Sequence, residues 1–113
     1  MHELTLAENM LQLVEETARR ERATRVKTVV VEIGQLALIE TDALIFAFDV
    51  VKKGGIAANA ELRIIDIPAF GDCGNCGVSS PMAKVYATCP QCGSANMQPT
   101  AGQEMQLRQI EIE

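Results

Sequence analysis

Apolar residues near the start of the chain recur every three or four positions, at Ala7, Met10, Leu11, Val14 and Ala18. This spacing places them on one face of a helix, opposite polar and charged residues. Just before them, Thr5 and Glu8 have the form of a capping box, in which the Thr5 side chain accepts from the Glu8 amide and the Glu8 side chain reaches back. The pattern predicts a helix that begins at Thr5 and leaves residues 1–4 free.

The next apolar segment, residues 25–33, is rich in β-branched side chains on both of its faces. A strand of this kind is typical of the centre of a sheet. After a loop through residues 35–40, Thr41 is a candidate N-cap for a second helix, which we expect to end at Lys53 because Gly54 follows. The residues expected to face the core from this helix are Leu44, Phe48 and Val51.

Two further strands are predicted on either side of the cysteine region, at residues 60–67 and 105–112. In the second strand the apolar positions change parity, which predicts a bulge near Arg108 and Gln109. Because the two strands bracket the cysteines, we expect them to form a hairpin whose far end carries the cysteine module.

All four cysteines lie in two short motifs, Cys73-Gly-Asn-Cys76-Gly and Cys89-Pro-Gln-Cys92-Gly, with twelve residues between them. Two residues between ligands let both sulfurs of a motif reach one ion, and the glycine that follows can take a positive φ and free backbone amides for the thiolates. Two such pairs complete a tetrahedron that saturates zinc and leaves no position for water. The motifs therefore predict a zinc site that is structural and not catalytic.

Other uses of the four cysteines stay open. Disulfides are disfavoured in a reducing compartment. A thioredoxin-like pair needs a reactive cysteine at the start of a helix, whereas both pairs here lie among Gly, Pro and Asn. An iron–sulfur cluster would use the same thiolate donors.

The composition suits one modest domain with a metal-stapled satellite, because the chain has 113 residues, 48% of them hydrophobic and 22% charged. No apolar run is long enough for a membrane span and the first residues lack a secretory pattern, so we expect a cytoplasmic protein. The net charge of −5 repels phosphate. Between Gly71 and Met97, Lys84 is the only basic and Tyr86 the only aromatic residue, which also disfavours nucleic-acid binding.

His2 is the only histidine of the chain and lies next to the α-amine of Met1. The amine, the His2 amide nitrogen and the imidazole can chelate one metal ion, and Glu3 can complete a square plane that suits Ni(II) or Cu(II). Acid should empty such a site, because the amine and the imidazole must be deprotonated to bind. The alternative is a solvated terminal histidine with no role.

An enzyme is not indicated by the reactive residues present. With one histidine at the extreme terminus and every cysteine assigned to zinc, no Ser-His, Cys-His or open-zinc constellation can be assembled. We therefore expect no catalytic residues.

The chain resembles the HypA/HybF family of nickel metallochaperones for [NiFe]-hydrogenase maturation over nearly its whole length. The resemblance rests on Met1-His2-Glu3-Leu4, on Val31-Glu32-Ile33-Gly34-Gln35-Leu36, on the two cysteine motifs and on Ile110-Glu111-Ile112. It implies an α+β fold of two helices on a three-stranded mixed sheet with an inserted zinc ribbon. The implied division is a nickel-binding domain at residues 1–69 and 101–113, with the ribbon at residues 70–100.

The resemblance also implies a function, which is to carry Ni(II) as transient cargo to the [NiFe]-hydrogenase large-subunit precursor together with a HypB-type GTPase. Nickel would be bound by the Met1 amine, by the backbone and side chain of His2, and by Glu3, while Glu40 matches a position where an acidic residue can assist. Zinc at the four cysteines would be structural. A homodimer is left open, and some family members carry ribbon histidines that this chain lacks.

Two other functions compete with this one. The first is a zinc-ribbon adaptor that only binds protein and in which His2 has no role. The second is a nucleic-acid-binding ribbon, against which the scarcity of basic and aromatic residues argues.

Overall fold

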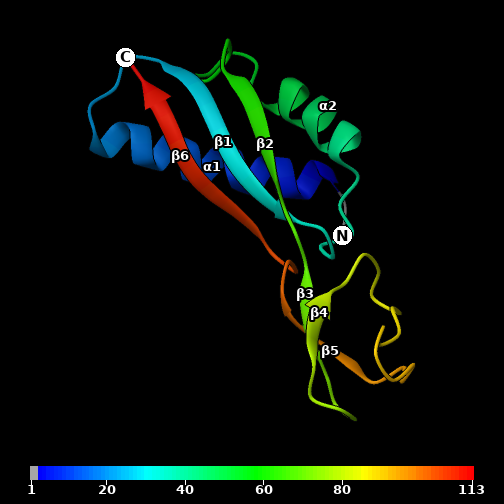
Figure 1. Ribbon diagram of the computed structural model, residues 1–113. Coiled ribbons are helices and arrows are strands. Elements are labelled where there is room, and N and C mark those ends of the chain that lie inside the picture. Colours follow the sequence, from blue (N-terminus) through cyan, green and yellow to red (C-terminus); the bar gives the residue numbers. More distant parts are fainter. Residues whose placement is uncertain (1–2) are drawn as a thin grey trace. The chain divides into compact units, whose positions relative to one another are not determined.

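The computed structural model describes residues 3–113 of the chain. Its elements, in order, are α1 (Glu3–Arg20), β1 (Val26–Gly34), α2 (Thr41–Val51), β2 (Glu61–Ile67), β3 (Phe70–Cys73), β4 (Ser79–Pro81), β5 (Met97–Ala101) and β6 (Met105–Ile112). One sheet has the order β2-β1-β6 and the other β4-β3-β5. In Figure 1 the arrows of β1 and β2 point the same way and β6 runs against them. The predicted fold class, two helices with a three-stranded mixed sheet, is confirmed.

The first helix buries the predicted stripe, with Ala7, Met10, Val14 and Ala18 at its core. Its start was predicted wrongly. Glu3 and Leu4 are already helical, so Thr5 and Glu8 lie inside the helix and form no capping box at its start. An acidic side chain such as Glu3 is stabilised in the first turn by the helix dipole, which extends the helix toward the terminus.

The second helix packs on the first and buries Leu44 and Phe48, as predicted, whereas Val51 is only half-buried. The predicted cap was one residue off. The Leu44 amide donates to the Glu40 carbonyl at 3.0 Å, which makes Glu40 the N-cap, with an extended backbone and no capping side-chain bond. Thr41 is therefore the first helical residue, and the last is Val51 instead of Lys53.

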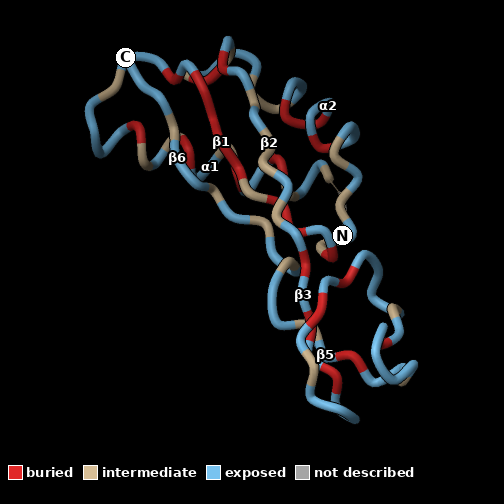
Figure 2. Tube along the Cα trace, viewed as in Figure 1, coloured by how far each residue is buried: buried red, intermediate tan, exposed pale blue. Residues whose placement is uncertain are grey.

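The predicted central strand is central. β1 lies between β2 and β6, and Val29 and Val31 in it are completely buried. Figure 2 shows buried positions following one another along β1, whereas the strands beside it are half-buried or exposed. This position also corrects the predicted hairpin: β2 and β6 bracket the cysteines in sequence, but β1 separates them in the sheet.

The predicted bulge in β6 is wrong as well. The Glu113 amide donates to Arg25 and the Gly34 amide donates to Glu104, each at 2.8 Å, so the same number of residues separates these bonds on both strands. In this register Leu107 lies opposite Val31 and Ile110 lies opposite Thr28, on the other face. The apolar side chains in the two halves of β6 therefore lie on opposite faces of the sheet, without a bulge between them.

The chain forms two compact units. The first comprises residues 1–31, 39–64 and 107–113, and the second comprises residues 32–38 and 65–106. The second unit has its own buried cluster, made of Leu36, Ala69, Cys73, Met82, Cys89 and Met97. The predicted division into domains at residues 70 and 100 stays a prediction.

Within the second unit, the backbone segments around Gly34, Ala69 and Gly102 approach each other closely. The Leu36 amide donates to the Gly102 carbonyl at 2.7 Å. A Cβ at Gly102 would lie 2.5 Å from the Ala69 Cα, and Gly102 has a φ of +89°. Only glycine meets both conditions without strain.

We expect Gly102→Ala to lower the free energy of unfolding by about 3 kcal/mol, because it adds a backbone overlap to a left-handed conformation. Gly54→Ala is the matched control, since Gly54 has a φ of +83° but no atom within 4 Å of the added Cβ. The control should lose about 1–2 kcal/mol. Urea denaturation followed by circular dichroism measures both, and equal losses would show that the close approach is not a constraint.

Candidate metal centre

The two cysteine motifs fold into matching turns. Gly77 donates its amide to the Cys73 carbonyl and Gly93 donates to the Cys89 carbonyl, each at 2.9 Å. The two glycines have φ values of +78° and +76°, in the left-handed region that the spacing predicts for them. Each turn brings the second cysteine of its motif back over the first.

One turn is placed by a sheet and the other by a loop. Cys73 ends β3 and pairs with Met97 of β5. Its amide donates to the Val78 carbonyl at 2.9 Å, as the Cys89 amide donates to Ser94 at 2.8 Å. The first cysteine of each motif is buried and the second is exposed.

Backbone amides point at the buried sulfurs. The amides of Asn75 and Cys76 lie 3.4 Å from the Cys73 Sγ, and the Cys92 amide lies 3.4 Å from the Cys89 Sγ. The Asn75 side chain adds a donor 3.7 Å from the Cys92 Sγ. Donors of this kind stabilise a thiolate and so favour metal binding.

These bonds lower the pKa of the buried thiols in the metal-free chain. The amide of Cys76, followed by that of Asn75, lowers the pKa of Cys73 to about 6, and the amide of Cys92 lowers the pKa of Cys89. The Val78 amide acts in the same direction on Cys76, but burial and the neighbouring sulfurs outweigh it and raise its pKa to about 12. Four sulfurs held together cannot all ionise without a cation between them.

The four sulfurs fit a single tetrahedral ion. All four lie within 4.8 Å of one another, and the Cys73–Cys92 and Cys76–Cys89 sulfur pairs are 3.6 Å apart. A tetrahedron with zinc–sulfur bonds of about 2.3 Å has edges of about 3.8 Å. A cluster of several irons would hold its cysteines farther apart, because sulfides lie between the metals. The arrangement suits zinc and leaves no coordination position open.

The residues predicted to bind nickel lie elsewhere in the chain. Glu3 is half-buried in the first turn of α1, and Glu40 is exposed at the N-cap of α2. Met1 and His2 lie outside the described residues. The assignment of these four residues to nickel stays a prediction.

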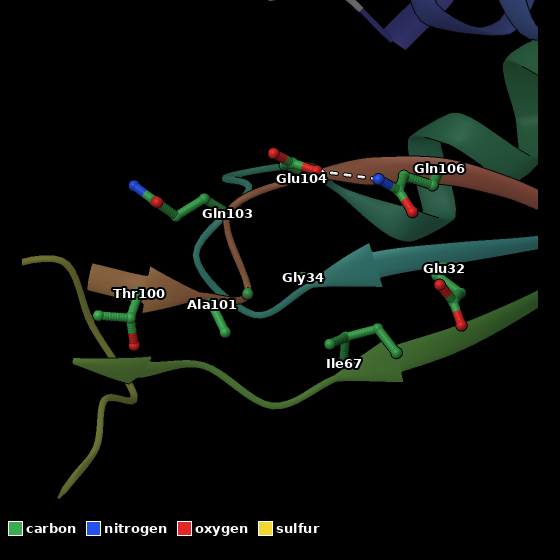
Figure 3. Close-up of a pocket in the computed structure, with 9 residues that line it drawn as sticks. Glu32, Gly34, Ile67, Thr100, Ala101, Gln103, Glu104 and Gln106 are labelled. Atoms are coloured by element: carbon green, nitrogen blue, oxygen red, sulfur yellow. Dashed lines mark hydrogen bonds between the residues drawn. The ribbon is translucent and has the colours of Figure 1, made fainter. Parts of the chain in front are cut away.

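A polar hollow of about 250 Å³ also lies within the second unit, lined by Glu32, Gly34, Ile67, Thr100, Ala101, Gly102, Gln103, Glu104 and Gln106. Figure 3 shows the Glu104 carboxylate turned toward Gln106, which donates to it at 3.0 Å, while Glu32 lies across β1 from them. The hollow contains two carboxylates but no cysteine or histidine. Within the described residues, the four cysteines alone gather as a group suited to a metal.

Sequence reasoning missed the part played by Leu36. It was assigned to a loop, but it is buried in the same cluster as Cys73 and Cys89. Its amide bond to Gly102 continues the β1–β6 pairing beyond the strand. The apolar side chain at this position was the only sequence signal for its burial. Its place in the cluster depends on pairing with a segment far along the chain, which the sequence does not reveal.

A helix pair, a mixed sheet and four sulfurs placed to hold one ion define a small metal-binding protein. Comparison with known proteins gives the family. The family model for hydrogenase/urease nickel incorporation, metallochaperone HypA, matches residues 1–112. The chain therefore belongs to the HypA family of nickel-incorporation metallochaperones, as its resemblance had indicated.

Individual relatives agree with the family model. The hydrogenase maturation factor HypA of Dechloromonas aromatica is 53% identical over the full length of both chains. The HypA of Azoarcus sp. is 45% identical over 99% of this chain and 98% of its own. The solution structure of the nickel metallochaperone HypA from Helicobacter pylori matches with a TM-score of 0.72 at 30% identity, covering 99% of this chain and 97% of that one. None of the helices in residues 3–113 is long and apolar enough to cross a membrane.

The pKa values lead to a prediction about proton release. At pH 7 Cys73, with a pKa of about 6, is largely ionised, whereas Cys76, with a pKa of about 12, keeps its proton until a metal displaces it. Zinc binding at pH 7 should therefore release protons, that of Cys76 among them, and the affinity for zinc should fall as pH falls. Calorimetry in buffers of different ionisation enthalpy counts these protons.

The control is Cys76→Ser, which removes the thiol with the raised pKa. This variant should bind zinc more weakly and release about one proton fewer. A count of zero in the unchanged chain, or a zinc affinity that does not change with pH, would contradict this prediction.

Proposed function

We propose that the chain binds Ni(II) at its N-terminus and delivers it to the [NiFe]-hydrogenase large-subunit precursor. The proposed donors are the α-amine of Met1, the backbone nitrogen and imidazole of His2, and Glu3. The observation that carries the proposal is that α1 begins at Glu3. The first amides of a helix have no acceptor within it, so the Glu3 nitrogen is free to serve a metal without breaking a helical bond.

The proposed donor set suits a cargo ion. Nitrogen donors in a square plane favour Ni(II), and their protonation competes with binding near neutral pH. A mildly acidic environment, or a partner that offers better ligands, can therefore remove the ion. Four thiolates around zinc form a site that does not exchange in this way.

Glu40 is proposed as an additional nickel donor. Its side chain makes no capping hydrogen bond, although a side chain at the N-cap position often accepts one from the first turn of the helix. In Figure 1 the first turns of α1 and α2 lie at the same end of the helix pair, where Glu3 and Glu40 are found. A carboxylate from α2 could then reach a metal held at the start of α1.

The four cysteines, Cys73, Cys76, Cys89 and Cys92, are proposed as the ligands of a structural zinc. The supporting observations are the sulfur separations and the amides directed at Cys73 and Cys89. A saturated ion offers no site to a substrate, so the proposed activity is carriage of nickel and not catalysis.

The proposed partners are a HypB-type GTPase and the hydrogenase precursor, met in the cytoplasm, where reducing conditions keep the four thiols available to metal. The relatives named as hydrogenase maturation factors support this setting. No nucleic-acid or membrane partner is proposed, and a homodimer is left to experiment.

A short N-terminal extension tests the nickel site directly. Two residues added before Met1 should abolish nickel binding, because they convert the amine into an amide and move the terminus. Titration of Ni(II) by calorimetry measures this, with zinc content followed in parallel and expected to stay at one ion per chain. Unchanged nickel affinity would contradict nickel binding by the N-terminal residues.

Two substitutions separate the roles of the proposed donors. His2→Ala should lose nickel binding and hydrogenase maturation with no change in melting temperature, because a terminal side chain contributes little packing. Glu40→Gln keeps the size of the side chain and should weaken nickel binding less than His2→Ala does. Unfolding of the His2 variant, or full nickel affinity in it, contradicts the proposal, and an unaffected Glu40 variant removes Glu40 from the site.

A further inference from the structure

An open apolar groove of about 420 Å³ lies within the second unit. Two short segments form it, residues 35–38 after β1 and residues 83–86 between the cysteine motifs. Leu36 is buried beneath it, and Leu38, Val85 and Tyr86 are exposed beside it. None of the residues that line the groove is a cysteine or one of the proposed nickel donors.

The described contacts do not explain why these apolar side chains are exposed. Leu38 is 82% exposed and Tyr86 is 76% exposed. Leu38 also has a φ of +58°, a conformation that costs a leucine free energy and gains no burial in return. Large apolar side chains gathered around a concave surface mark a place where another molecule binds.

The charges around the groove indicate which kind of partner it would bind. Lys84 is the only lysine or arginine in residues 32–38 and 65–106, a region that carries the carboxylates Glu32, Asp66, Asp72 and Glu104. Lys84 lines the groove, and its Nζ lies 5.5 Å from the centre of the Tyr86 ring. The single cation of an otherwise acidic unit thus lies beside its most exposed aromatic ring.

From these features we propose that the groove is a docking site for a partner protein segment that carries a large apolar side chain next to a carboxylate. The apolar side chain would fill the space above Leu36, between Leu38 and Val85. The carboxylate would pair with Lys84, which the Tyr86 ring helps to hold in place. Charge complementarity favours this partner over a basic one, because a cation would meet Lys84 and no nearby acid of the groove.

The groove also depends on the metal site. Leu36 belongs to the cluster that contains Cys73 and Cys89, so the floor is fixed only when the two cysteine motifs are held together. Loss of the metal from the four cysteines would therefore remove the docking site.

A pair of capped peptides tests the proposal on the zinc-loaded full chain. One has the sequence Ser-Asp-Phe-Leu-Asp-Ser, and the other has lysine in place of both aspartates. Amide shifts in two-dimensional NMR spectra report where each binds. We expect the acidic peptide to shift residues 35–38 and 83–86, and to bind about fivefold more tightly than the basic one.

Substitutions at the surface identify the groups responsible. Tyr86→Ala should abolish peptide binding, and Lys84→Glu should reverse the preference for the acidic peptide. The matched controls are Phe46→Ala and Lys53→Glu, which change an exposed aromatic and an exposed lysine of the first unit. Both controls should bind as the unchanged chain does, and every variant should keep its zinc.

Several results would overturn the proposal. They are shifts that map outside the groove, no binding by the acidic peptide, or equal binding of the two peptides. Shifts in residues 35–38 and 83–86 that grow with protein concentration alone would show that a second copy of the chain is the occupant instead. None of these results depends on nickel, so failure here leaves the proposed function intact.

Discussion

The second unit depends on one constraint, which is that the four cysteine sulfurs are held around a single point. Two of the six buried residues in its cluster are cysteines, and the large apolar residues there are Leu36, Met82 and Met97. Burial of such a side chain contributes about 1.5–3 kcal/mol, whereas a structural zinc contributes roughly 10–16 kcal/mol. The metal-free sulfurs do not ionise together, since the pKa of Cys73 is lowered and that of Cys76 is raised. A cation at their centre is therefore what completes this unit.

The two proposed metals call for opposite chemistry. The proposed zinc would be held by four thiolates, of which Cys73 and Cys89 are buried and accept from amides, and it would have no free coordination position. The proposed nickel cargo needs donors that can be protonated or displaced, which the proposed set of Met1, His2 and Glu3 would supply next to the first amides of α1. In this proposal the two sites use different residues, so nickel could be exchanged while zinc stays bound.

Local rules in the sequence predicted much of this molecule, and long-range pairing accounts for what they missed. The Cys-x-x-Cys spacing is a local device, so the clustered sulfurs and the positive φ of Gly77 and Gly93 followed from it. Helix periodicity predicted the buried face of α1. The start of the helix was predicted wrongly, because Thr5 and Glu8 match a capping box although α1 already begins at Glu3. The apolar faces of β1 predicted its central place, but its pairing with β2 and β6 and the burial of Leu36 were missed, because both arise from segments far apart in sequence.

Hydrogen exchange with and without zinc tests the central claim most directly. In the second unit, the amides of Cys73, Met82 and Cys89 donate to Val78, Ala69 and Ser94, and they should lose their protection when a chelator removes the metal. In the first unit, the amides of Val26 and Lys52 donate to Ile56 and Phe48, and they should stay protected. Protection that persists in the second unit without zinc, or that disappears from both units together, would contradict the account.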